Sequence, residues 1–201
     1  ATFSARQVAS FGIDDIETFT AAEVGSISSS AISGLSSATV AALTTGQITS
    51  LGTAAISGLT SAQMTALTTN QVEALATAQV AALGSRQLAS LGLDDIAVLY
   101  ASQIAALSSA GIPGLTTDQI GALTSRQVEA LTATQIAAFS SAQMAILGLN
   151  GLDSLTLADL SAISSSALAG LPVATIAALS ANQVAALSPS AMAGLTTEIG
   201  R

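Results

Sequence analysis

Two adjacent acidic pairs, Asp14-Asp15 and Asp94-Asp95, are the residues of this sequence whose type and spacing come nearest to a chemical role. Carboxylates could hold Ca²⁺, but a calcium site needs six or more converging oxygens, and no glycine-rich Asp repeat accompanies either pair. Negative charge is also stabilising in the first turn of a helix, where it meets the positive end of the helix dipole. We therefore interpret both pairs as structural.

Covalent catalysis has equally little support. The chain is rich in Ser but has no His and no Lys, so it lacks an ordinary base to activate a hydroxyl. It also has no Cys, which excludes disulfides and thiol chemistry, and without Cys and His the usual zinc ligands are missing. No Gly-rich phosphate loop occurs. We predict that the protein is not an enzyme, with no catalytic, cofactor-binding or metal-binding residues and no cofactor.

Charge and hydropathy exclude further classes of partner. Twelve acidic residues against four Arg give the 201-residue chain a net charge of −8. This argues against nucleic acid, because phosphate binding depends on Lys and Arg. Half of the residues are hydrophobic, but Ser, Thr or Gln interrupts nearly every octet and no run approaches the roughly 20 apolar residues of a spanning helix. We expect no membrane insertion.

The sequence repeats every eight residues from end to end. With Phe3 as position 1, octets such as LTTDQIGA (115–122) and LTSRQVEA (123–130) follow without insertion or deletion. Position 1 is Leu, Ile or Phe in all 25 units, and position 6 is Val, Ile, Leu or Met in all 24 complete ones. Position 5 is Gln in 12 of 24. Charged residues occur only at positions 4, 5 and 7. This predicts that one face of every octet is buried away from solvent, with position 6 in the core and position 4 exposed.

Positions 2 to 5 of many octets read Ser/Thr-x-x-Gln, as in Thr116 to Gln119. This pattern is a capping box, in which the hydroxyl caps the start of a helix and the Gln side chain reaches back to the backbone of the cap. One continuous helix is excluded, because alternating steps of 5 and 3 residues would rotate the apolar stripe by about 40° per step. We therefore expect about two helical turns over positions 3 to 9, and a corner at the next cap.

The predicted fold class is all-α: a solenoid of short N-capped helices, one for each octet. A β-solenoid is the alternative, because short periods with Thr, Val and Ile suit it. Against it, the apolar spacing mixes odd and even steps, whereas strands have period two. The whole chain, 1–201, is predicted to be one continuous octapeptide-repeat solenoid. Because Ala1 is not an initiator Met, we expect a processed chain or a fragment of a longer one.

Glycines and prolines give local tests of this fold. We expect glycines at positions 2 and 8 to ease the corners by adopting positive φ; they include Gly52, Gly58, Gly84, Gly114 and Gly194. Pro189 falls at position 3, where its fixed φ suits the start of a helix. Pro172 occupies a cap position without a hydroxyl, and Pro113, late in its octet, predicts an irregular helix there.

Two resemblances follow from these motifs. LTTDQIGAL (115–123) resembles the helix opening LTPxQV of TAL-effector DNA-binding repeats over about six residues per unit. The period differs, the base-reading loop is missing and the charge has the opposite sign, so this resemblance implies only the capping. The whole chain resembles in style the Ala/Thr/Gln-rich octapeptide arrays of large secreted or surface-anchored bacterial repeat proteins.

These features predict a structural protein, extracellular or on a cell surface, that forms a stiff stalk, a spacer or a self-assembling fibre. A surface with only 8% charged residues is poorly protected against self-association, and solenoids without polar caps have adhesive ends. The alternative is an adhesin-type module whose Ser/Thr rows at positions 2 and 3 bind a glycan, a partner protein or ice. The cap role also accounts for these rows.

Overall fold

The computed structural model describes the backbone of residues 4–196 and the side chains of residues 4–192, and no β-strand occurs in that part of the chain. Short helices follow one another throughout. In order they are α1 (Ala5–Val8), α2 (Ile13–Thr18), α3 (Ala21–Gly25), α4 (Ser29–Ile32), α5 (Ser37–Ala41), α6 (Thr45–Ser50), α7 (Thr53–Ser57), α8 (Ser61–Ala66), α9 (Thr69–Glu73), α10 (Thr77–Ala81), α11 (Ser85–Ala89), α12 (Leu93–Ala97), α13 (Ala101–Ala106), the 3-10 helix η1 (Ile112–Gly114), α14 (Thr117–Gly121), α15 (Ser125–Glu129), α16 (Ala133–Ala137), α17 (Ser141–Ser154), α18 (Leu157–Ala162), α19 (Ser165–Leu168), α20 (Val173–Ala178), α21 (Ala181–Ala186) and α22 (Pro189–Thr196).

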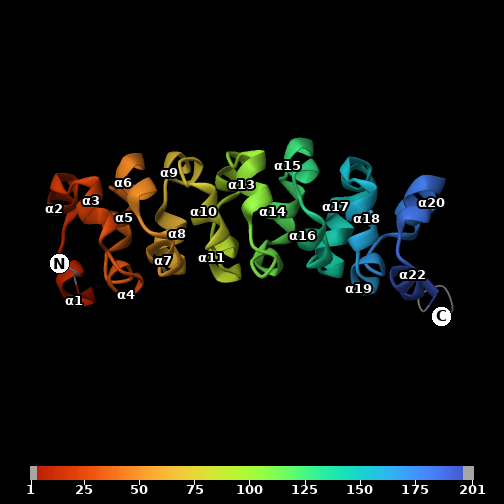
Figure 1. The fold of residues 1–201 in the computed structure, drawn as a ribbon, viewed down its shortest axis with the longest axis horizontal. Coiled ribbons are helices and arrows are strands. Elements are labelled where there is room, and N and C mark those ends of the chain that lie inside the picture. The colour runs from red at the N-terminus through yellow and green to blue at the C-terminus, as the bar shows by residue number, and fades with distance from the viewer. Residues whose placement is uncertain (1–3, 197–201) are drawn as a thin grey trace.

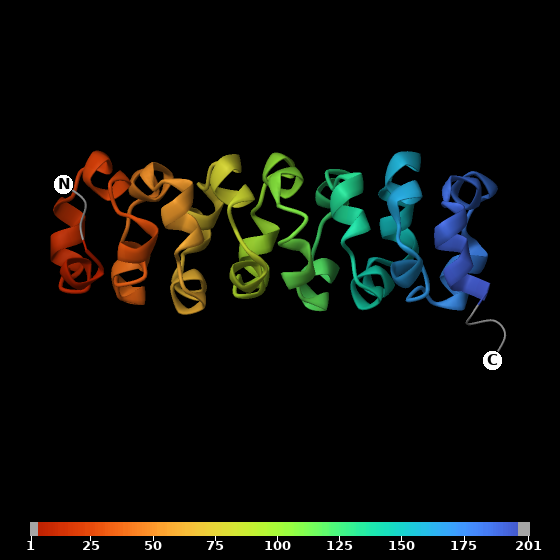
Figure 2. The same ribbon diagram turned by 60° about the horizontal axis from the view of Figure 1, so that its bottom comes forward.

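The helices wind into an elongated rod, with the two ends of the chain at opposite ends of the molecule (Figure 1). The turned view shows the same ordered progression from N-terminus to C-terminus (Figure 2). Each helix packs on the helix three octets later, as in α3 with α6, α5 with α8 and α10 with α13. The predicted all-α solenoid is therefore confirmed, and the β-solenoid alternative is wrong for the described residues.

The capping box starts the helices as predicted. At α14 the hydroxyl of Thr116 accepts the backbone N–H of Gln119 at 3.2 Å, and the Gln119 side-chain oxygen accepts the N–H of Thr116 at 2.8 Å. The helices are shorter than the predicted span of positions 3 to 9, since nearly all end at position 7 or 8 and a few at position 6. The next position 1 is extended, as at Leu51 with φ −60° and ψ 130°. This conformation turns the apolar side chain inward and leads the backbone into the next cap.

Burial follows the predicted register. Position 6 is buried in every octet from Ile32 to Leu168, and position 4 is exposed throughout the described residues. Position 1 is buried from Ile27 to Leu171 with one exception, the half-buried Leu123. Two aliphatic side chains per octet thus form one continuous core along the rod, and burying each contributes about 1.5–3 kcal/mol.

The prediction that glycines at positions 2 and 8 ease the corners by adopting a positive φ is wrong. Gly52, Gly58, Gly84 and Gly114 do not have a positive φ, and Gly148, with φ 61°, is the one described residue that does. Gly52 and Gly58 have φ of −64° and −84°. The corner consists of a right-handed residue at position 8 followed by an extended one, so it needs no left-handed conformation. Position-8 glycines such as Gly58 instead allow the backbones of two turns to pack closely against each other.

The three prolines behave as the sequence predicts. Pro189 is the first residue of α22. Pro172 stands at the N-cap of α20 and makes no side-chain cap hydrogen bond. The octet that contains Pro113 forms only the three-residue helix η1, because proline lacks the backbone donor that a longer helix would use there.

Candidate functional site

Ten of the twelve glutamines at position 5 lie inside the solenoid. The charge pattern did not predict this, because it groups position 5 with the exposed position 4. Gln119 is only 2% exposed. Its side-chain oxygen completes the capping box, and its Nε2 donates to the carbonyls of Leu88 and Leu91 at 2.9 and 2.8 Å. One side chain therefore caps its own helix and ties it to the previous turn.

The same bonds recur along the rod. In ten octets the Gln Nε2 donates to backbone carbonyls 28 residues and 30 or 31 residues earlier, and we call this set the glutamine ladder: Gln47, Gln63, Gln71, Gln79, Gln87, Gln103, Gln119, Gln127, Gln135 and Gln143. One turn of the solenoid thus takes between three and four octets. A net gain of about 0.5–1.5 kcal/mol per hydrogen bond is typical, and no buried side-chain N or O lacks a partner within the described residues.

The acidic pairs lie in first helical turns. The Oδ2 atoms of Asp15 and Asp95 accept the backbone N–H groups of Gly12 and Gly92, each at 2.9 Å. This placement favours the structural interpretation. Asp95 is only 8% exposed; its burial raises the pKa of its carboxyl above the ordinary value, the neighbouring Asp94 adds to this, and the Gly92 hydrogen bond opposes it.

Neither a metal-binding cluster nor a membrane-spanning helix occurs among residues 4–196. No group of three or more Asp, Glu, His or Cys in that range is arranged to hold a metal ion. None of the described helices has the length and apolar character needed to cross a membrane.

A second kind of octet replaces the glutamine by close packing of the backbone. Position 5 is Ala or Gly in six octets, and five of these end in Gly at position 8: ISSSAISG, LGTAAISG, LSSAGIPG, ISSSALAG and LSPSAMAG. A Cβ on Gly58 would lie 2.3 Å from the Ser29 carbonyl oxygen, and one on Gly114 would lie 2.0 Å from that of Ser85. Only glycine allows this approach. The surroundings of Gly194 lie outside the described side chains.

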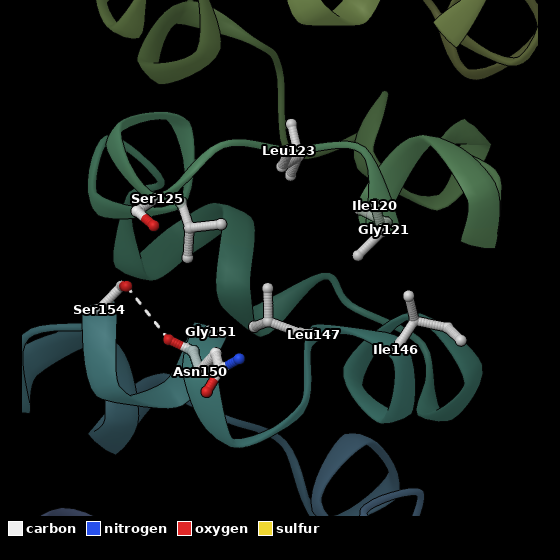
Figure 3. Close-up of a pocket in the computed structure, with 10 residues that line it drawn as sticks. Ile120, Gly121, Leu123, Ser125, Ile146, Leu147, Asn150, Gly151 and Ser154 are labelled. Atoms are coloured by element: carbon white, nitrogen blue, oxygen red, sulfur yellow. Dashed lines mark hydrogen bonds between the residues drawn. The ribbon is translucent and has the colours of Figure 1, made fainter.

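The sixth octet, LGLNGLDS (147–154), has neither device. It has Gly151 at position 5 and Ser154, not Gly, at position 8. A cavity of about 310 Å³ lies here, lined by Ile120, Gly121, Leu123, Ser125, Val128, Ile146, Leu147, Asn150, Gly151 and Ser154. Figure 3 shows Leu147 and Gly151 on one side of it and Leu123 on the other. No site was predicted here from the sequence, although the sequence does show Gly151 at position 5 without the usual Gly at position 8, where Ser154 stands.

The irregular backbone of this octet accompanies the cavity. Helix α17 runs through two octets, and its kink is at Gly148, the residue with positive φ. Ile146, at a position that is small in nearly every octet, is 50% exposed. Opposite, Leu123 is the half-buried exception at position 1. The cavity is therefore the place where the array departs furthest from its own rule, and it is the candidate binding site of the molecule.

Part of the array matches a known repeat. Residues 40–77, 88–125 and 96–133 match the ALTTAQ repeat. The second and third segments overlap with an offset of one octet, which agrees with the octet as the repeating unit. No curated protein and no solved structure is significantly similar to the chain. The chain is thus a repeat protein with a helical solenoid architecture.

Proposed function

We propose that this protein is a non-catalytic structural element of an extracellular or cell-surface protein, acting as a stiff stalk or spacer or, by self-association, as a fibre. The observation that carries the proposal is the glutamine ladder. It joins successive turns by the same buried hydrogen bonds over residues 16–143, and it uses the polar side chains inside the rod to hold the rod together.

Stiffness follows from the way each turn is held. A ladder glutamine such as Gln127 makes bonds within its own octet and bonds to carbonyls 28 and 31 residues earlier. Bending the rod would have to open such bonds in a buried environment, where unpaired polar groups are costly. In repeat arrays each unit contacts only its neighbours, so length can be adjusted by adding or removing octets without changing this local unit.

The test of the spacer is the relation between sequence length and rod length. We would duplicate residues 83–138, which are seven complete octets, and measure both proteins by small-angle X-ray scattering and negative-stain microscopy. The longer chain should give a proportionally longer, equally straight particle. Flexible or globular particles would refute the stalk, and uniformly monomeric particles at high concentration would refute the fibre.

The extracellular location needs a separate test. Fractionation of the source cells, with protease treatment of intact cells, should remove the protein from the surface or find it in the medium. Recovery only from the protected interior would refute this part of the proposal and leave the spacer intact.

A binding module remains the second candidate because of one surface observation. At position 3 several hydroxyl side chains are exposed, among them Thr45, Thr117 and Ser125, whereas the position-2 hydroxyls cap helices, as Thr116 does. The position-3 row continues with exposed apolar residues, including Leu93 and Leu157, 49% and 59% exposed. Glycan-array and ice-growth assays test this function, and negative results in both would remove its glycan and ice forms.

A further inference from the structure

We propose that the cavity at octet 147–154 is a binding site for a small neutral carboxamide with a compact apolar body. The ligand would place its NH₂ group where a ladder glutamine places its own. This inference goes beyond the structural role, because it gives the rod one specific site.

The chemistry comes from the spacing of the ladder. Every ladder amide donates to carbonyls 28 residues and 30 or 31 residues earlier, and at Gly151 this spacing selects Leu123 and Ile120. Both residues line the cavity together with Gly151. In a regular octet these two carbonyls would receive the Gln Nε2, as those of Ile104 and Leu107 receive Gln135 at 2.8 and 2.7 Å.

Both carbonyls have capacity for a donor. Within the described part of the chain no hydrogen bond reaches the carbonyl of Leu123, and that of Ile120 accepts the Leu123 N–H at 3.3 Å. The equivalent carbonyl of Ile104 accepts the Leu107 N–H at 3.1 Å and Gln135 at the same time. A carbonyl oxygen has two lone pairs, so a ligand NH₂ can bridge Ile120 and Leu123 as Gln135 bridges its two acceptors.

The lining decides the charge and the body of the ligand. Ile120, Leu123, Val128, Ile146 and Leu147 supply apolar surface, and no charged side chain lines the cavity. An ammonium would lose its hydration without a counter-charge, and a carboxylate could not donate to a carbonyl. A neutral primary amide avoids both costs. The volume of about 310 Å³ lies at the low end of small-molecule sites, which are roughly 300–1,000 Å³.

The cavity persists because Ser154 stands where five related octets have Gly. Gly170, at the same position of ISSSALAG, would bring a Cβ to 2.3 Å from the Ser141 carbonyl oxygen, so glycine there lets two backbones meet and leaves no space. The Ser154 hydroxyl instead donates to the Asn150 carbonyl at 3.2 Å (Figure 3). The larger residue keeps the backbones apart.

The experiment is a ¹⁵N NMR titration of the full chain with benzamide, benzoate and methyl benzoate, three molecules of similar shape of which only benzamide carries an NH₂ donor. Benzamide should shift saturably the amide resonances of residues 120–128 and 146–154, and the two others should bind at least tenfold more weakly. Absence of saturable binding, or equal binding of all three, would overturn the proposal.

Two variants and a matched control place the site. Gly151→Gln supplies the amide within the chain, and it also requires the Leu147 side chain to move, because a Cβ on Gly151 would lie 2.3 Å from Leu147 Cγ. Ser154→Gly restores the closing glycine. Both variants should weaken benzamide binding at least tenfold. Ser90→Gly makes the same change at position 8 of an octet that has its ladder glutamine, Gln87, and should leave binding unchanged. Unchanged binding in a folded Gly151→Gln or Ser154→Gly would overturn the assignment; should either variant not fold, the comparison of the three ligands still decides.

Discussion

Two neighbouring octets, LSSAGIPG (107–114) and LTTDQIGA (115–122), pack on the previous turn in different ways. In the second, Gln119 extends to the carbonyls of Leu88 and Leu91. In the first, position 5 is Gly111, and Gly114 brings its backbone so close to Ser85 that a Cβ would lie 2.0 Å from its carbonyl oxygen. The same interface between turns is filled by a side chain in one octet and by the approach of two backbones in the other.

The comparison shows that positions 5 and 8 are coupled. A long side chain at position 5 occurs with many residues at position 8, but Ala or Gly at position 5 is combined with Gly at position 8 in five octets of six. Because close packing leaves no room for even one extra methylene without strain, each combination needs its own spacing between turns. The octet is thus one sequence period with two structural solutions.

The strongest way to break the comparison is Gly114→Ala. Its Cβ would meet the backbone at Ser85, and backbone cannot rotate away as a side chain can, so we expect a loss of about 3 kcal/mol in the free energy of unfolding. Gly52→Ala is the control, since its Cβ would meet nothing within 4 Å, and it should cost less than about 1 kcal/mol. Equal urea-unfolding midpoints for the two variants would contradict the close-approach explanation.

The next largest effect tests the ladder. Gln119→Leu keeps a side chain of similar size but removes the amide, so the Leu88 and Leu91 carbonyls and the Thr116 N–H lose this partner. We expect a loss of about 2 kcal/mol in the free energy of unfolding. Gln7→Leu is the matched control: Gln7 makes the same capping bond to Ser4, is exposed, and has no described octet before it. The difference between the two variants in urea denaturation measures the ladder bonds alone. No difference would mean that these bonds add nothing to stability.

A smaller, pH-dependent effect is expected at Asp95, which stands at position 5 opposite the carbonyls of Met64 and Leu67 by the ladder spacing. Its pKa is raised in the folded state. The contribution of such a carboxyl to the free energy of unfolding is fully present below its unfolded-state pKa of about 3.9. This contribution is lost as the pH rises through the folded-state pKa. Asp95→Gln should therefore stabilise the fold by about 1 kcal/mol at pH 7.

Urea unfolding of Asp95→Gln and of the original chain at pH 7 and pH 3 checks this prediction, because the gain should shrink at the lower pH. Asp15→Gln, at an exposed position 5, is the control and should change little at either pH. A gain that grows toward pH 3 would have the wrong sign and refute the explanation.

The smallest effect is expected at position 4, which is exposed in both kinds of octet. Arg126→Asp reverses a charge at such a position, and exposed substitutions usually change stability by less than about 0.5 kcal/mol. Hydrogen exchange of residues 115–139 should be nearly unchanged. Loss of protection comparable to that in Gln119→Leu would show that position 4 takes part in packing.

The parts of this fold that the sequence predicts are the local ones. The cap at Thr116, the core position of Val128 and the irregular octet at Pro113 all depend on residues within one octet. The second role of Gln119 depends on carbonyls 28 and 31 residues away, and only the number of octets per turn decides which carbonyls these are. The carboxylate of Asp95 misleads for the same reason: its charge suggests exposure to solvent, yet the side chain is only 8% exposed.

The candidate site was hidden for a related reason. The sequence contains the unusual combination of Gly151 and Ser154, but its meaning appears only when five other octets are seen to close their interfaces with Gly at position 8. Leu123 and Ile120 come from octets three and four units earlier, and no local pattern connects them with Gly151. Absence of the familiar catalytic residue types therefore did not settle whether the array has a site.

The glutamine ladder also bears on how the molecule would yield to a pulling force. Every hydrogen bond of the ladder joins segments at most 31 residues apart. A rod stretched from its two ends can therefore unfold one turn while the other turns stay folded. Releasing about 28 residues would add about 95 Å of extended chain. Tension would then be relieved in equal steps, and each turn could rewind on its neighbour when the load falls, as in an extensible tether.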